Sequence, residues 1–114
     1  MMVSHVVLMQ PRSDLSIDDR RALVAAFERA VREIPTVRSV RVGSRVVHGA
    51  GYEQQMPPTG EYLVVIDFDD LAGLQTYLQH PAHQDLGARF GRSLASSLVY
   101  DFDVDGVDKL QSLV

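Results

Sequence analysis

The sequence predicts an α+β fold in which one four-stranded antiparallel sheet carries helices, in the ferredoxin-like order β-α-β-β-α-β. Three observations predict it: four segments have strand-like apolar patterns, helical periodicity with cap signals separates them, and a proline splits the second helical region. Strands are expected at residues 3–10, 37–48, 61–69 and 98–104, and helices at 16–35, 70–80 and 81–94. The 114 residues form one domain, with a core at about 3–104 and a C-terminal tail at 105–114.

The chain opens with a strand that is apolar on both faces apart from His5, which shares a face with Val7 and Met9. A strand that is apolar on both sides is expected to be covered on both sides. The helix that follows begins at Ser16, a favourable N-cap residue with acidic residues after it in the first turn. Pro35 ends that helix.

The middle of the chain predicts two strands joined by a long loop. In the second strand valines alternate with Arg41 and Arg45, and Gly43 favours a bulge or bend. Residues 49–60 are rich in Gly, Gln and Pro without periodicity, which indicates a loop. The third strand has the strongest pattern, with large apolar residues at every second position, and residues 98–104 repeat that alternation to close the sheet.

The second helical region is expected to break at the dipeptide His80-Pro81. Proline suits the first turn of a helix, so His80 is the natural N-cap and His83 falls inside the first turn. The positive end of the helix dipole disfavours an imidazolium there and leaves a neutral ring that can accept a proton. His83 also shares a helical face with Leu86 and Phe90, so it is expected to point toward the apolar side.

One face of such a sheet is covered by the helices, and the other face is here also too apolar to lie in water. A second copy of the chain would cover it, which predicts a homodimer through the sheet face and a dimeric α+β barrel. The tail at 105–114 is expected to be helical through Leu110 and Leu113 and to strap the partner subunit.

Composition excludes several classes of partner and site. The net charge is −4 with no basic stripe, which disfavours nucleic acid as a partner. There is no cysteine, hence no disulfide framework and no thiolate nucleophile, which fits a cytoplasmic protein. Residues 1–5 lack the features of a signal peptide, and no window approaches the ~18 apolar residues of a membrane span. The expectation is a soluble cytoplasmic protein with no membrane partner.

Three features together carry a resemblance: His5 in the first strand, Tyr77 followed by His80-Pro81-Ala82-His83, and the closing strand Val99-Tyr100-Asp101-Phe102. Over about residues 3–104 the chain resembles the stress-responsive A/B barrel (Dabb) family of the dimeric α+β barrel superfamily. Most of that family has no assigned activity. One plant member is a cyclase that closes a linear polyketide by aldol condensation.

The resemblance implies roles for three residues, because Tyr77 and His83 match the tyrosine and histidine that act in the plant cyclase. His83 would be a general base that takes a proton from a carbon next to a carbonyl, and the Tyr77 hydroxyl would support the developing oxyanion. His5, which matches the family's first-strand histidine, would orient or polarise the ligand. The alternative is structural: His83 would bond the backbone and pack beside Phe90, and Tyr77 would be a core aromatic with its hydroxyl at the surface. His5 would then pack at the strand edge.

These roles leave three hypotheses of function. The first is a cofactor-free enzyme acting on a small aromatic or polyketide-like molecule, with a largely apolar cavity between the sheet and the split helix. The second is a non-catalytic, stress-associated dimer or a protein that binds an apolar ligand. The third is a cofactor-free monooxygenase, as found elsewhere in the superfamily. A continuous pocket that reaches His83 and Tyr77 would favour an enzyme, whereas a structural dimer would fill that space with side chains.

No metal site is expected. A zinc triad of His5, His80 and His83 is disfavoured because the capping role points His80 away from the others. Residues 101–106 copy the start of an EF-hand loop, but Ser112 stands where the loop needs its glutamate. The acidic residues of this segment are therefore interpreted as the exposed face of a strand.

Overall fold

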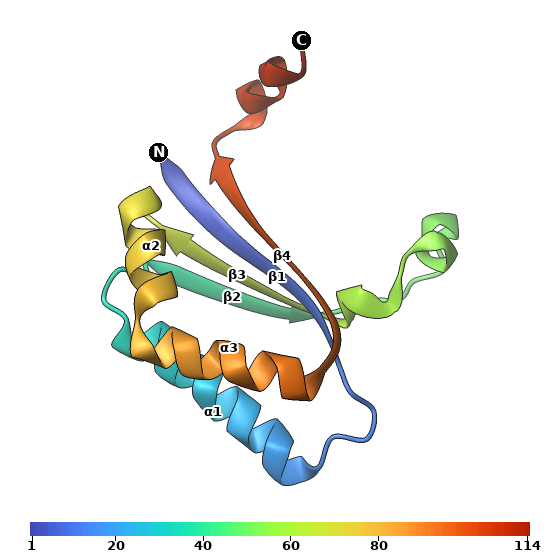
Figure 1. The fold of residues 1–114 in the computed structure, drawn as a ribbon. Coiled ribbons are helices and arrows are strands. Elements are labelled where there is room, and N and C mark those ends of the chain that lie inside the picture. The colour runs from blue at the N-terminus through green and yellow to red at the C-terminus, as the bar shows by residue number, and fades with distance from the viewer.

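The computed structural model describes residues 1–114 and confirms the ferredoxin-like α+β fold (Figure 1). Its strands and α-helices are β1 (Met2–Pro11), α1 (Ile17–Glu33), β2 (Ser39–Ser44), β3 (Tyr62–Phe68), α2 (Leu71–Gln79), α3 (Pro81–Ser93) and β4 (Leu94–Val104). Short 3₁₀ helices lie at η1 (Gly51–Gln55), η2 (Pro58–Glu61) and η3 (Val107–Leu113). The strands form one sheet in the order β2-β3-β1-β4, and every neighbouring pair is antiparallel.

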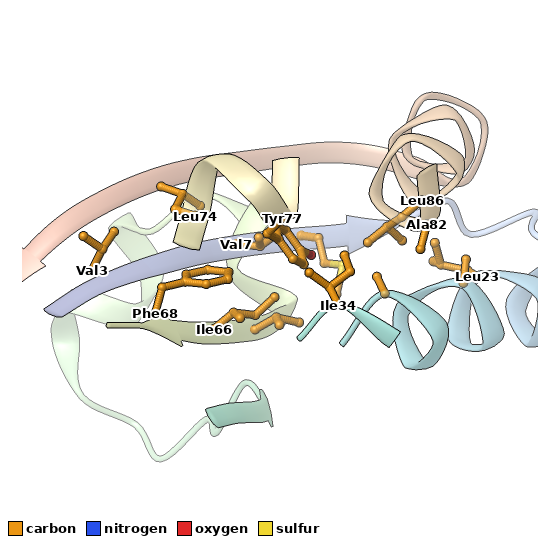
Figure 2. Packing of buried hydrophobic residues seen from close by; sticks show 14 residues of the cluster. Val3, Val7, Leu23, Ile34, Ile66, Phe68, Leu74, Tyr77, Ala82 and Leu86 are labelled. Carbon is orange, nitrogen blue, oxygen red and sulfur yellow. The ribbon is translucent and has the colours of Figure 1, made fainter. Parts of the chain in front are cut away.

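The hydrophobic core lies between the helices and one face of the sheet (Figure 2). Alternate residues of the two central strands point into it, so that Val7 on β1 lies opposite the buried Val64 on β3. From the helical layer α2 contributes Leu74 and Tyr77, and α3 contributes Leu86. The apolar side chains at alternate strand positions and on the inner faces of the helices therefore pack in a single layer.

The predicted caps are confirmed. The Ser16 hydroxyl accepts a hydrogen bond from the Asp19 backbone N–H at 3.1 Å and starts α1. His80 ends α2 and caps α3, since its Nδ1 accepts from the Ala82 N–H at 3.0 Å. Each side chain satisfies one of the backbone donors that a helix start leaves free.

Two strand boundaries differ from the sequence prediction. β2 ends at Ser44 because β3, its only neighbour in the sheet, begins at Tyr62, the residue that pairs with Ser44. β4 begins at Leu94, four residues early, because the long β1 pairs with it as far as Pro11. The bulge predicted at Gly43 is wrong: the β2–β3 register runs through Gly43 without a shift.

The face of the sheet away from the helices is open and apolar. On β4 it presents Leu98, Tyr100 and Phe102, of which Tyr100 is 55% exposed and Phe102 48% exposed. Val6 and Leu8 of β1 lie beside them, because they pair with Tyr100 and Leu98. An aromatic and aliphatic row of this kind on a single chain marks an interaction surface.

Two segments project from this sheet: residues 45–61, here called the arm, and residues 105–114, the tail (Figure 1). The radius of gyration is 15.5 Å, against about 13 Å for a compact domain of this length. The accessible surface is 7626 Å², whereas size scaling gives about 6,200 Å² for a compact 12.7 kDa monomer. The chain thus exposes about 1,400 Å² more than a compact monomer would.

None of the helices combines the length and the apolar character that crossing a membrane requires.

Candidate functional site

The three residues singled out from the sequence come together, although they lie on β1, α2 and α3. The Tyr77 ring contacts both histidine rings, with its centroid 4.8 Å from that of His83 and 5.7 Å from that of His5. Phe68 of β3 packs on the same tyrosine at 5.3 Å. The break at His80-Pro81 makes this cluster, because it turns α3 so that its first turn lies beside the last turn of α2.

His83 is half-buried and is held by one hydrogen bond. Its Nδ1 lies 3.1 Å from the backbone carbonyl oxygen of Leu78. Because a carbonyl only accepts, Nδ1 must carry the proton, and in the neutral ring Nε2 then keeps its lone pair. Burial lowers the pKa of His83 below its ordinary value; the bond to Leu78 opposes this shift and the nearby His5 adds to it. The structure therefore holds His83 as a neutral imidazole with an acceptor at Nε2.

Tyr77 is 1% exposed and is one of the largest fully buried side chains. Burial raises the pKa of its hydroxyl to about 12, so the phenol stays protonated across the physiological range. Every buried side-chain nitrogen or oxygen atom of the chain has a hydrogen-bond partner. Because the Tyr77 hydroxyl bonds to no other residue, it must keep a small opening to solvent. It is thus a donor that no group of the chain occupies, on a ring that contacts the ring of His83.

His5 is fixed by Asp101, a residue that sequence reasoning assigned to an exposed strand face. His5 and Asp101 lie directly opposite each other on β1 and β4, and His5 Nδ1 is 2.6 Å from Asp101 Oδ1. A carboxylate accepts, so Nδ1 carries the proton and Nε2 is the free nitrogen. The Asp101 side chain is 41% exposed, as the sequence predicted, but alternation places it on the helix side of the sheet because Tyr100 and Phe102 occupy the open face. That alternation was the signal that could have found it.

His80 stays outside this cluster, as its capping role requires, because its Nδ1 is engaged by the backbone of α3. No group of three or more His, Cys, Asp or Glu side chains is arranged to hold a metal ion.

The largest hollow lies elsewhere than the sequence predicted. It measures about 490 Å³ and lies between α1 and the β2–β3 half of the sheet, with Met9, Leu23 and Phe27 among its apolar lining. None of the four principal hollows is lined by His5, Tyr77 or His83. The space beneath the split helix is instead filled, because side chains such as Tyr77, Leu74 and Leu86 pack there against the sheet (Figure 2). This filling favours the non-catalytic dimer over an enzyme, and a substrate could reach His83 only if the packing around Tyr77 opened.

Comparison with solved structures places the fold among small ferredoxin-like proteins, several of them described as dimeric. A dimeric ferredoxin-like protein of unknown function from Jannaschia sp. CCS1 is 25% identical, with a TM-score of 0.72 over 91% of this chain and 100% of that one. A similar dimeric protein from Thermobifida fusca is 22% identical, with a TM-score of 0.69 over 91% of this chain and 92% of that one. A hydroxynitrile lyase from Passiflora edulis is 15% identical, with a TM-score of 0.74 over 93% of this chain and 95% of that one.

The family model of the stress-responsive A/B barrel domain matches residues 3–104. The chain therefore belongs to that family, which confirms the resemblance seen in the sequence. A comparison with curated protein sequences finds no significant match.

Proposed function

We propose that this protein is a homodimeric, cofactor-free acid–base enzyme acting on a small aromatic or polyketide-like molecule, with His83 as the base. The observation that carries the proposal is the contact between the ring of a neutral, singly bonded His83 and the ring of Tyr77, whose hydroxyl makes no hydrogen bond within the chain. Because the chain leaves this hydroxyl open to solvent, a substrate carbonyl can replace water as its hydrogen-bond partner. This hydroxyl is held ready for a partner that the chain does not supply.

In the proposed reaction a carbonyl oxygen of the substrate accepts a hydrogen bond from the Tyr77 hydroxyl. His83 Nε2 takes a proton from the carbon next to that carbonyl, and the electron pair of the broken C–H bond moves into the carbonyl as an enolate. The Tyr77 hydroxyl stabilises the negative charge that develops on oxygen, and its high pKa keeps its own proton in place. The enolate carbon can then attack a second carbonyl, and His83 returns the proton to the new alkoxide.

His5 and Asp101 supply the positioning half of this proposal. The 2.6 Å bond to the Asp101 carboxylate fixes the His5 ring, which contacts Tyr77, and leaves its Nε2 as the free nitrogen. Such an aspartate–histidine pair selects one tautomer and one ring orientation. His5 is therefore assigned to orienting a polar group of the substrate, and Asp101 to positioning His5.

The dimer is supported by the open face and by the similar solved structures that are described as dimeric. The chain exposes about 1,400 Å² more surface than a compact monomer would, which is more than the ~800 Å² that each partner contributes to an interface of standard size. Sedimentation equilibrium at micromolar concentration is expected to give twice the 12.7 kDa chain mass, and a stable monomer would contradict the barrel.

The test of catalysis is a screen of small β-polyketone and phenolic compounds against the wild type and two variants. His83→Ala is expected to reduce turnover of any compound processed by about 10²–10⁴-fold, the usual contribution of general base catalysis. Gln84→Ala, an exposed neighbour on the same helix, is the matched control and is expected to leave turnover unchanged. Equal turnover by wild type and His83→Ala would end the assignment of the base.

A second candidate function, binding of an apolar ligand without chemistry, is favoured by the hollow of about 490 Å³ beneath α1. It predicts saturable binding of an apolar fluorescent probe that is blocked by Leu23→Trp and unaffected by His83→Ala. Turnover that depends on His83 would assign the protein to the enzyme class instead. Oxygen consumption with a phenolic substrate would identify the third hypothesis, the monooxygenase.

A further inference from the structure

The arm and the tail present complementary surfaces at opposite ends of the sheet. The arm folds back beside the start of β4 and encloses a second hollow of about 410 Å³. Leu8 and Leu98 of the open face form its floor, and Tyr52 and Met56 of the arm are among its walls. The tail follows the other end of β4 and carries Leu110, 60% exposed, together with Leu113 and Val107.

The tail cannot reach the hollow of its own chain. Strands rise about 3.3 Å per residue, so Val104 at the end of β4 lies about 20 Å from Leu98 in the hollow. The tail then continues away from the sheet (Figure 1). Any occupant supplied by this sequence must come from a second copy.

The open face itself favours one way of pairing two copies. Its apolar side chains lie on β4, β1 and β3, whereas β2 presents Ser39, Arg41 and Gly43 at the edge opposite β4. A two-fold axis parallel to the strands would set the apolar β4 against the polar β2 of the partner. A two-fold axis across the strands sets β4 against β4 with the strands reversed, which buries apolar surface against apolar surface. The reversal brings the end of one β4 over the start of the other.

Charge supports the same match. Arg45 lines the hollow and its guanidinium bonds a backbone carbonyl, that of Glu53, at 3.1 Å, with no carboxylate as ion-pair partner. In the tail, Lys109 is paired with Asp103 at 2.8 Å, which leaves Asp108 without an ion pair. An unpaired cation in the hollow and an unpaired carboxylate in the tail are complementary.

We infer that each tail crosses to the second copy of the chain and seats Leu110 in the hollow between that copy's arm and sheet, with Asp108 facing Arg45. The inference rests on the proposed homodimer and specifies its symmetry. Two reciprocal straps then close the dimer, and the two exposed apolar segments cover each other.

The test is a disulfide cross-link, for which the chain is suited because it has no cysteine of its own. The double variant Leu110→Cys with Met56→Cys is expected to form a covalent dimer on mild oxidation, doubling the mass seen on a denaturing gel. A bridge within one chain is ruled out by distance, because a disulfide needs its Cα atoms within about 7 Å. Leu110→Cys with Val24→Cys, which pairs the tail with an equally exposed site on α1, is the matched control and should stay monomeric on the gel.

The outcomes separate the strap from the dimer. A covalent dimer from Leu110→Cys with Arg41→Cys, or from Leu110→Cys alone, would overturn the inference, because the tail would lie on β2 or on the other tail. If the wild type sediments as a dimer but the double variant Leu110→Cys with Met56→Cys forms no covalent dimer, the strap alone would be overturned. A monomeric wild type would overturn both the strap and the proposed homodimer. Leu110→Ala is expected to weaken dimerisation about a hundredfold, because each dimer loses two buried leucine side chains, whereas Val24→Ala should leave dimerisation unchanged.

Discussion

Replacing Tyr77 by phenylalanine separates the hydroxyl's chemistry from the ring's packing. The ring fills the space between α2 and the sheet, against Phe68 and both histidines, and phenylalanine keeps it. The hydroxyl contributes no hydrogen bond to the fold. At neutral pH the free energy of unfolding of the variant is therefore expected to lie within about 1 kcal/mol of the wild-type value. Truncating a buried aromatic ring to alanine would instead cost about 3–5 kcal/mol.

At high pH the two proteins are expected to diverge. The hydroxyl pKa is about 12 in the fold and 10.0 in the unfolded chain. Because the folded-state pKa is raised, its contribution is fully present below pH 10 and is lost as the pH rises toward 12. Two pKa units correspond to about 3 kcal/mol of lost stability in the wild type, and Tyr77→Phe lacks this loss.

The assay is urea unfolding followed by circular dichroism at intervals from pH 8 to pH 12 on both proteins. The difference between the two curves isolates Tyr77, because every other titrating group is common to both. A constant difference across this range would refute the reasoning, since it would show that burial does not perturb the hydroxyl. A large destabilisation at neutral pH would show instead that the hydroxyl has a structural partner.

Three further outcomes are expected. The His83 imidazole should titrate by NMR below 6.5, with its neutral proton on Nδ1; stability should then fall as the pH drops through 6.5, because the unfolded chain takes up that proton first. Asp101→Asn should keep the fold but release the His5 ring, which would be seen as averaging of the His5 NMR signals. It should also lower turnover, and adding His5→Ala should lower turnover no further. Additive losses in the double variant would contradict the coupling of the two residues. Ile66→Ala, at a fully buried position, should cost about 2–5 kcal/mol in chemical unfolding, whereas the exposed Val24→Ala should cost well under 1 kcal/mol.

Much of the fold follows from local signals in the sequence. The Ser16 and His80 caps, the proline that starts α3 and the period-two strands each act over a few residues, so they can be interpreted without knowledge of the partner elements. Boundaries that depend on a neighbour were missed. β4 starts early because β1 extends beside it, and β2 stops where β3 begins.

The candidate site divides in the same way. The residue types and the break between α2 and α3 could be taken from the sequence, and the family resemblance identified Tyr77 and His83. The distance between Tyr77 and His83 could not be predicted from the sequence, because helical spacing does not extend across the break at His80-Pro81. Asp101 was missed because the side to which an edge strand turns its polar residues depends on where the helices lie.

The sequence by itself determined the elements, their order, the family and the residue types at the site, since caps, periodicity and motifs are short-range properties of the chain. Only the tertiary structure decided the strand register that pairs His5 with Asp101, the hydrogen bond that sets the His83 tautomer, and the place of the largest hollow. These depend on packing between segments up to 96 residues apart, where the shapes of all the intervening side chains act together.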